Sequence, residues 1–175
     1  MYGLPVRSCE KTATTVLEIF HFSFSVFYDI LSAEGFVSDA EPLLKLSGEA
    51  LAGEKKQGFD EDTVRAVALQ VKQLVDDGIQ VGIVIGGGNF WRGRTSEHID
   101  RTKADQIGML ATVMNCIYVS EIFRSVGMMT NILTPFECGS FTKLFSKDRA
   151  NKYFEKGMVV FFAGGTGHPY FSTDT

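Results

Sequence analysis

The chain has 175 residues, of which 45% are hydrophobic, enough for one domain with a substantial apolar core. Its 17 Lys and Arg against 21 Asp and Glu give a formal net charge of −4, which argues against bulk electrostatic binding of nucleic acid and leaves local anion sites. The three cysteines form no CxxC pair and the three histidines have no metal-ligand spacing, which favours reduced thiols in a cytoplasmic protein without a metal site of its own.

The first 42 residues differ in pattern from the rest of the chain. Residues 20–27 alternate apolar with small or polar side chains, a strand-like period. A signal peptide or membrane span is disfavoured, because Glu18 and Asp29 bracket a run too short to cross a bilayer and no clean cleavage pattern flanks it. We therefore predict an atypical segment over residues 1–42 and a domain over residues 43–175.

From residue 43 onward, short apolar runs alternate with amphipathic segments that end at glycines. This pattern predicts strands over residues 43–46, 79–85, 128–133 and 158–163. It predicts helices from a cap at Asp60 to Gly78, from about Thr102 to Arg124, and from Ser146 or Asp148 to Lys156. Near-continuous apolar strands joined by helices are typical of an α/β fold with a mostly parallel sheet.

The apolar positions of the two longer helices predict which face of each is buried. In the first helix these are Val64, Val67, Ala68, Val71, Leu74 and Val75. In the second they are Ile107, Leu110, Ala111, Met114, Ile117 and Tyr118.

Gly86, Gly87 and Gly88 follow the second strand directly, and Asn89 and Arg92 come next. Glycines can adopt positive φ and bring N–H groups close to an anion, while a guanidinium can hold phosphate oxygens in pairs. Ligands of parallel sheets bind at the carboxyl ends of the strands, where residues 45–49 and 164–174 would also lie. A glycine pair after one strand is more often only a tight turn, so it is the convergence of these segments that predicts a phosphate site.

Two familiar nucleotide fingerprints are absent from these loops. No GK[ST] follows the glycines, and the third glycine of GxGxxG is missing at Trp91 and at Tyr170. A P-loop enzyme and a dinucleotide dehydrogenase are both disfavoured. Phe90 and Trp91 are predicted to pack, and Arg94, Arg101 and Lys103 to form a solvated basic face.

Four ordered segments resemble bacterial UMP kinase, a member of the amino acid kinase superfamily. They are KLSGEAL at 45–51, IGGGN at 85–89 with Arg92 and Gly93, ADQIGMLAT at 104–112, and the run 164–175. The resemblance covers residues 43–175 and implies the N-terminal part of a three-layer α/β/α sandwich of the carbamate kinase type. It also implies transfer of the γ-phosphoryl of ATP, with Mg²⁺, to UMP in a cytoplasmic enzyme that is usually a homohexamer regulated by GTP and UTP. No nucleic acid or membrane partner is implied.

The resemblance assigns roles only where residues match. Catalytic roles fall on Lys45, Arg92 and Asp174, and Lys45 and Arg92 are expected to neutralise charge on the transferred group. The ATP-binding residues would be Lys45, Ser47, Gly48, Gly88 and Arg92. The UMP-binding residues would be Gly87, Asp105, Thr166, Gly167, His168, Pro169, Tyr170, Phe171, Ser172 and Thr173.

Two of these assignments carry alternatives, and a third residue departs from the family pattern. Asp105 lies three residues after Thr102 and could serve a capping-box-like role at the helix start. Asp174 could be a helix N-cap. His168 stands where many members of the family have Asn, which puts one polar contact in doubt.

The chain also departs from the family at both ends, and residues 1–42 resemble nothing in the family. It stops at Thr175, whereas the family continues with the elements that bind the adenine and ribose of ATP, so we expect a truncated chain that turns over poorly. The truncation is expected to leave a sheet edge and apolar helix faces uncovered. Two alternatives to an active UMP kinase remain. The chain could be a non-catalytic UMP-binding or phosphate-binding fragment, or another superfamily member acting on an amino acid or carbamate.

Overall fold

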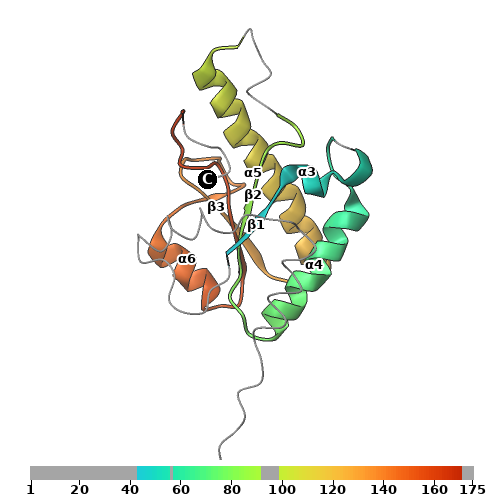
Figure 1. Cartoon of the computed structure of the whole chain (residues 1–175). Coiled ribbons are helices and arrows are strands. Elements are labelled where there is room, and N and C mark those ends of the chain that lie inside the picture. The colour runs from blue at the N-terminus through green and yellow to red at the C-terminus, as the bar shows by residue number, and fades with distance from the viewer. Residues whose placement is uncertain (1–42, 56, 92–98, 171–175) are drawn as a thin grey trace, which may run out of the picture.

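The computed structural model describes residues 43–55, 57–91 and 99–170, which form a parallel sheet with helices packed on it (Figure 1). The strands are β1 Leu43–Leu46, β2 Gly82–Ile85, β3 Thr130–Thr134, β4 Lys143–Leu144 and β5 Val159–Phe162. The helices are α3 Gly48–Leu51, α4 Glu61–Asp76, α5 Arg101–Ser125 and α6 Lys147–Phe154, with one 3₁₀ turn, η1, at Gly53–Lys55. The predicted N-terminal segment 1–42 lies outside the described residues.

All neighbouring strands of the sheet run parallel, in the order β1-β2-β5-β3-β4. The predicted α/β class with a mostly parallel sheet is therefore confirmed. β5, the last strand in the sequence, lies between β2 and β3, so the segments that follow β1, β2 and β5 emerge side by side. The sequence pattern did not predict the two-residue edge strand β4 or the short helix α3.

β2, β3 and β5 each begin later than the apolar runs predicted, and the same geometry explains all three. A glycine with positive φ ends the preceding helix: Gly78 at 83°, Gly127 at 93° and Gly157 at 66°. The N–H of the next residue then donates back into that helix instead of to the sheet, from Ile79 to Leu74, Met128 to Phe123 and Met158 to Tyr153. The first apolar residue of each run thus belongs to the helix C-cap.

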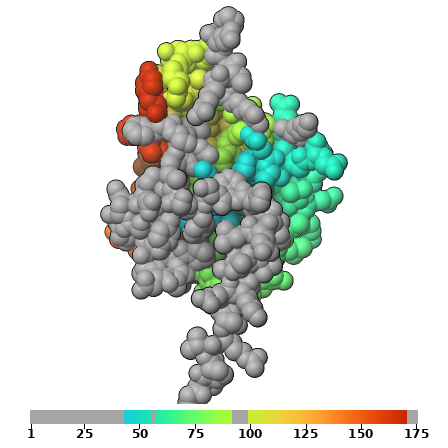
Figure 2. All heavy atoms as spheres, in the orientation of Figure 1, coloured from blue at the N-terminus to red at the C-terminus, as the bar shows by residue number. Residues whose placement is uncertain are grey.

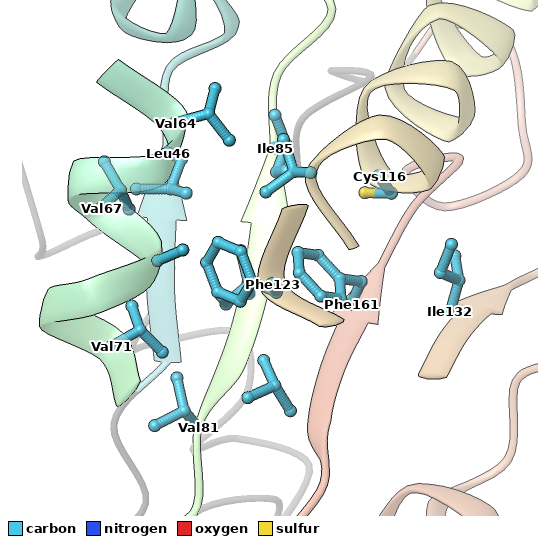
Figure 3. Close-up of a cluster of buried hydrophobic side chains, with 14 of the residues drawn as sticks. Leu46, Val64, Val67, Val71, Val81, Ile85, Cys116, Phe123, Ile132 and Phe161 are labelled. Atoms are coloured by element: carbon cyan, nitrogen blue, oxygen red, sulfur yellow. The ribbon is translucent and has the colours of Figure 1, made fainter. Parts of the chain in front are cut away.

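The core lies on both faces of the sheet, as the layered fold requires. On one face α4 and α5 pack against the strands, and Phe123 of α5 meets Phe161 of β5 edge to face with ring centroids 5.4 Å apart (Figure 3). On the other face α6 contributes Ala150 and Phe154 to a smaller cluster with Val160. The predicted inward face of α4 is buried except for Val75, which is partly buried against the same core.

The predicted inward face of α5 is largely wrong. Only Ala111 of the predicted set is fully buried, and Tyr118 is partly buried. The four large residues Ile107, Leu110, Met114 and Ile117 are exposed. The buried face instead carries many small or polar residues: Ala104, Gly108, Met109, Ala111, Thr112, Val113, Asn115, Cys116, Val119, Ser120 and Phe123. Apolar residues lie around much of α5, so their periodicity alone does not predict which face is buried. Where α5 packs closely on the glycine loops, only small side chains fit.

α5 is long and apolar enough to cross a membrane by length and composition. In the structure it is a core helix, packed against α4 and β3, with more than half of its most apolar window buried. Cys116 lies wholly inside this core, where burial raises the pKa of its thiol above the ordinary value. Cys116 and the partly buried Cys138 are both free thiols.

Candidate functional site

Three loops meet at the carboxyl edge of the sheet. They follow β1, β2 and β5, which are neighbouring strands. The N–H of Gly86 donates to the carbonyl of Leu46 at 3.1 Å, which joins the first two loops directly. In the space-filling view, the segment ending at residue 170 lies beside the N-terminal part of α5 (Figure 2). This edge is where parallel sheets bind ligands.

The first loop contains three of the predicted ATP-binding residues. Lys45 is half-buried in β1, and Ser47 is the N-cap residue of α3 without a hydrogen bond from its side chain to the helix. Gly48 is buried, and a Cβ atom at this position would lie 2.4 Å from the carbonyl oxygen of Gly86 and 2.6 Å from Oδ1 of Asn89. Glycine is therefore required here so that the first loop can approach the second.

The triple-glycine loop is shaped by close packing. None of the three described glycines Gly86, Gly87 and Gly88 has positive φ, so the expectation that they bend the chain in this way is wrong. A Cβ at Gly87 would lie 3.0 Å from Cβ of Ala111, and one at Gly88 would lie 2.9 Å from Oε1 of Glu49. These glycines let α5 and α3 pack directly on the loop backbone.

A buried pair of amide side chains fixes the same loop. Nδ2 of Asn115 donates to the carbonyl of Gly86 at 2.6 Å and to Oδ1 of Asn89 at 2.7 Å. Nδ2 of Asn89 donates to Oδ1 of Asn115 at 3.1 Å and to the carbonyl of Gly58 at 2.9 Å. Both side chains are almost completely buried, so these bonds compensate for their removal from water.

The third loop, residues 164–170, is where positive φ is used. Gly164, Gly165 and Gly167 have φ of 88°, 57° and 77°, and Tyr170 has φ of 71°, unusual for a residue with a side chain. Within the loop, the N–H of Gly167 donates to the carbonyl of Gly164, and the N–H of His168 donates to Oγ1 of Thr166 at 3.4 Å. Thr166, His168 and Tyr170 lie at the surface, and Tyr170 is 66% exposed.

α5 holds this third loop at both ends. At its start, the N–H of Gly164 donates to Oγ1 of Thr112 at 2.8 Å. At its far end, the N–H of Tyr170 donates to Oδ2 of Asp105 at 2.7 Å. Asp105 and Thr112 are seven residues apart and so share a face of the helix.

Asp105 therefore contacts the predicted UMP-binding loop. The alternative that it caps the helix is wrong, because Asp100 is the N-cap and its side chain accepts from the N–H groups of Thr102 and Lys103. The Asp105 side chain is 12% exposed and also pairs with the exposed Arg101, with Nε 3.2 Å from Oδ1.

Of the side chains around these loops, Phe90, Trp91, Arg101 and Lys103 lie as predicted, whereas Arg94 lies outside the described residues. Phe90 packs edge to face on Phe59, and Nε1 of Trp91 donates to the carbonyl of Ala104 at 2.9 Å. Arg101 and Lys103 are exposed. Within the parts of the chain that the structure describes, no three His, Cys, Asp or Glu side chains gather as a metal site.

Several predicted site residues lie outside the described residues. They are Arg92, Phe171, Ser172, Thr173 and Asp174. The described site thus comprises the first loop, the triple glycine, Asp105 and the third loop as far as Tyr170.

Two residues that hold the loops had no role in the sequence prediction, Thr112 and Asn115. Both are polar residues in an otherwise apolar stretch of helix, and with Gly108 they follow the spacing of one helix face. Polar side chains at this spacing on an apolar helix are a sequence signal that this helix face bonds to the backbone of another segment.

The chain is similar to known structures. UMP kinase from Bacillus anthracis is 35% identical, with a TM-score of 0.70, over 75% of this chain and 55% of that one. UMP kinase from Ureaplasma parvum is 31% identical, with a TM-score of 0.71, over 77% of this chain and 60% of that one. The chain thus spans somewhat over half the length of these two proteins. Residues 42–175 match the amino acid kinase family, and the chain belongs to that family.

Proposed function

We propose that this chain carries the UMP-binding part of a UMP kinase, which transfers the γ-phosphoryl group of ATP to UMP and yields UDP and ADP for pyrimidine nucleotide synthesis. The observation that carries the proposal is the convergence of three loops at one sheet edge, with Asp105 of α5 bonded to the third loop. The identity of 31–35% to two UMP kinases supports the choice of substrate.

In the proposed reaction a phosphate oxygen of UMP attacks the γ-phosphorus of ATP, and the bond from that phosphorus to the β,γ-bridging oxygen breaks. Such transfers depend mainly on positioning and charge stabilisation. We assign Lys45 and Arg92 to the charge on the transferred group, Ser47, Gly48 and Gly88 to ATP phosphates, and Gly87 to UMP. Because Gly87 and Gly88 are consecutive, one short loop would serve both nucleotides.

Asp105 and the third loop are assigned to UMP, with Thr166 to Thr173 forming the acceptor side. Each carboxylate oxygen has two lone pairs, so Asp105 can hold the N–H of Tyr170 and still accept from ribose hydroxyls. Asp174 is assigned as a further carboxylate of the site.

We assign Mg²⁺ to the bound ATP. Its chemistry would be neutralisation of the phosphate charge, and in such sites the ion is commonly held by the phosphates with few protein ligands. The described residues assigned to the ATP phosphates, Lys45, Ser47, Gly48 and Gly88, include no carboxylate, so the ion would be held there by the phosphates of ATP.

We also propose a homo-oligomer, a hexamer by resemblance, in the cytoplasm, with GTP and UTP as regulators of the assembled protein. The exposed apolar residues Ile107, Leu110, Met114 and Ile117 support self-association. They lie at spacings of three and four along α5, so they form one stripe that could meet its own copy across a two-fold axis. The free thiols Cys116 and Cys138 are consistent with a reducing compartment.

Calorimetry with UMP tests the proposed ligand, and a coupled assay for ADP release with UMP and Mg-ATP tests the reaction. We expect UMP to bind more tightly than CMP, glutamate or carbamate. Binding without ADP release would leave the chain as a UMP-binding domain. A preference for glutamate or carbamate would reassign it to another activity of the amino acid kinase family.

A further inference from the structure

Thr112 is hydrogen-bonded to the third loop and lies next to the triple-glycine loop. Its side chain is buried, and Oγ1 accepts from the N–H of Gly164 at 2.8 Å while donating to the carbonyl of Met109 at 2.7 Å. Its methyl carbon lies 3.6 Å from the point where a Cβ on Gly87 would be. The hydroxyl therefore holds the third loop, while the methyl group borders the triple-glycine loop.

Asn115 lies three residues further along α5 and holds the other side of the triple glycine. It donates to the carbonyl of Gly86 and to Asn89, and Asn89 in turn donates to Asn115 and to Gly58. Both hydrogens of each amide group are used. A buried polar network that is satisfied in this way favours one arrangement of the segments it joins.

We propose that Thr112 and Asn115 are positioning residues that fix the triple-glycine loop and the 164–170 loop relative to each other on α5. The inference rests on the proposed function, in which the 164–170 loop and Gly87 hold UMP and Gly88 holds the ATP phosphates. Neither side chain is assigned a contact with the nucleotides or with the reacting atoms. Both act through backbone groups, Gly164 N–H for Thr112 and Gly86 C=O for Asn115.

Substitutions at Thr112 test the first half by calorimetric UMP binding. Thr112→Val has nearly the same shape but leaves the buried N–H of Gly164 without the hydroxyl, and we expect UMP binding to weaken about 5- to 10-fold. Thr112→Ser keeps the hydroxyl and should restore affinity to within about twofold, because the lost methyl group makes no hydrogen bond.

Asn115→Asp tests the second half. The carboxylate keeps the size and the acceptor for Asn89 but faces the carbonyl of Gly86 with an oxygen, so it should push the triple-glycine loop away. We expect a loss of UMP affinity at least as large as that of Thr112→Val. If this variant does not fold, the Thr112→Val and Thr112→Ser pair still decides whether α5 positions the 164–170 loop.

Ser120→Ala is the matched control. Ser120 is also a buried hydroxyl on α5, but it bonds to Oγ1 of Thr130 at 2.8 Å, away from both glycine loops. We expect this variant to unfold at lower urea concentration and to bind UMP as the wild type does. Equal UMP affinity in Thr112→Val, Ser120→Ala and the wild type would overturn the proposal, because a purely structural role lowers stability without changing the affinity of folded molecules.

Hydrogen exchange separates failure of this inference from failure of the proposed function. A wild-type chain that does not bind UMP contradicts the function. In that case the positioning role is still decided by amide exchange, which Thr112→Val should accelerate in residues 164–170 and 86–89 more than in α4. Unchanged exchange in both loops would overturn the positioning role.

Discussion

Gly48 lies at the closest approach of the first two loops, where an added Cβ would be 2.4 Å from the backbone oxygen of Gly86. Backbone cannot move as freely as a side chain, so we expect Gly48→Ala to lower the free energy of unfolding by about 1–3 kcal/mol. Gly88→Ala is the comparison, because its nearest neighbour at 2.9 Å is the end of the Glu49 side chain. Urea titration should show a clearly smaller loss for Gly88→Ala, and equal losses would contradict the steric account.

Asp105 is the residue whose ligand role is most directly testable. Asp105→Ala removes both the charge and the acceptor for the N–H of Tyr170, so we expect UMP affinity to fall by about tenfold or more. Asp105→Asn keeps an acceptor and should lose less. Calorimetry should show a larger effect on UMP than on ATP, and the reverse order would assign Asp105 to the ATP side of the site.

The sequence indicated which glycines belong to the site, but it only partly indicated why glycine is needed at each position. The glycines near 164 do adopt positive φ, whereas Gly87 is needed because Ala111 and the carbonyl of Gly108 lie against it. Those neighbours are more than twenty positions away in the chain, and no local pattern reveals them. The same holds for Asn115, whose partners Gly86 and Asn89 come from another element.

At the scale of elements, helix ends were predicted best, because capping is local. Asp60 begins α4 as predicted, and its side chain accepts from the N–H of Thr63 at 3.0 Å. The inner face of α5 was predicted poorly, because much of that helix is apolar and packing against the loops selects its small side chains. Capping residues therefore predicted where helices begin and end in the chain, whereas tertiary contacts decide which face of α5 points into the core.

The Asp60 cap gives a pH prediction. The hydrogen bond from the Thr63 backbone N–H holds the pKa of the Asp60 carboxyl below its ordinary value of 3.8. The folded-state pKa is thus the lower one, so the stabilisation is complete above pH 3.8 and is lost as the pH falls through the folded-state value. Asp60→Asn caps the helix without titrating. We expect wild type to lose stability relative to this variant below pH 3.8 in urea titrations, and parallel pH profiles would contradict the assignment.

At the scale of the whole molecule, the convergence of the three loops could be predicted from one rule about parallel sheets. Once the strands were taken as parallel, residues after β1, β2 and β5 had to lie at one edge of the sheet. The strand order could not be read from the sequence in the same way, because β5 enters between β2 and β3 through long-range pairing. That insertion brings the third loop beside the triple glycine and next to α5.

The exposed stripe of α5 gives a prediction about assembly, with a second copy of this chain as the occupant. Leu110 is 56% exposed at the middle of the stripe, and a two-fold contact would bury two copies of it. We expect Leu110→Glu to raise the dimer dissociation constant about a hundredfold or more, since each buried leucine contributes roughly 1.5–3 kcal/mol. Leu69→Glu is the control, because Leu69 is similarly exposed but lies on α4. Sedimentation velocity should show dissociation of Leu110→Glu alone. Equal association of both variants would mean that another surface joins the copies, because a charge in the centre of an apolar contact cannot remain solvated when that contact forms.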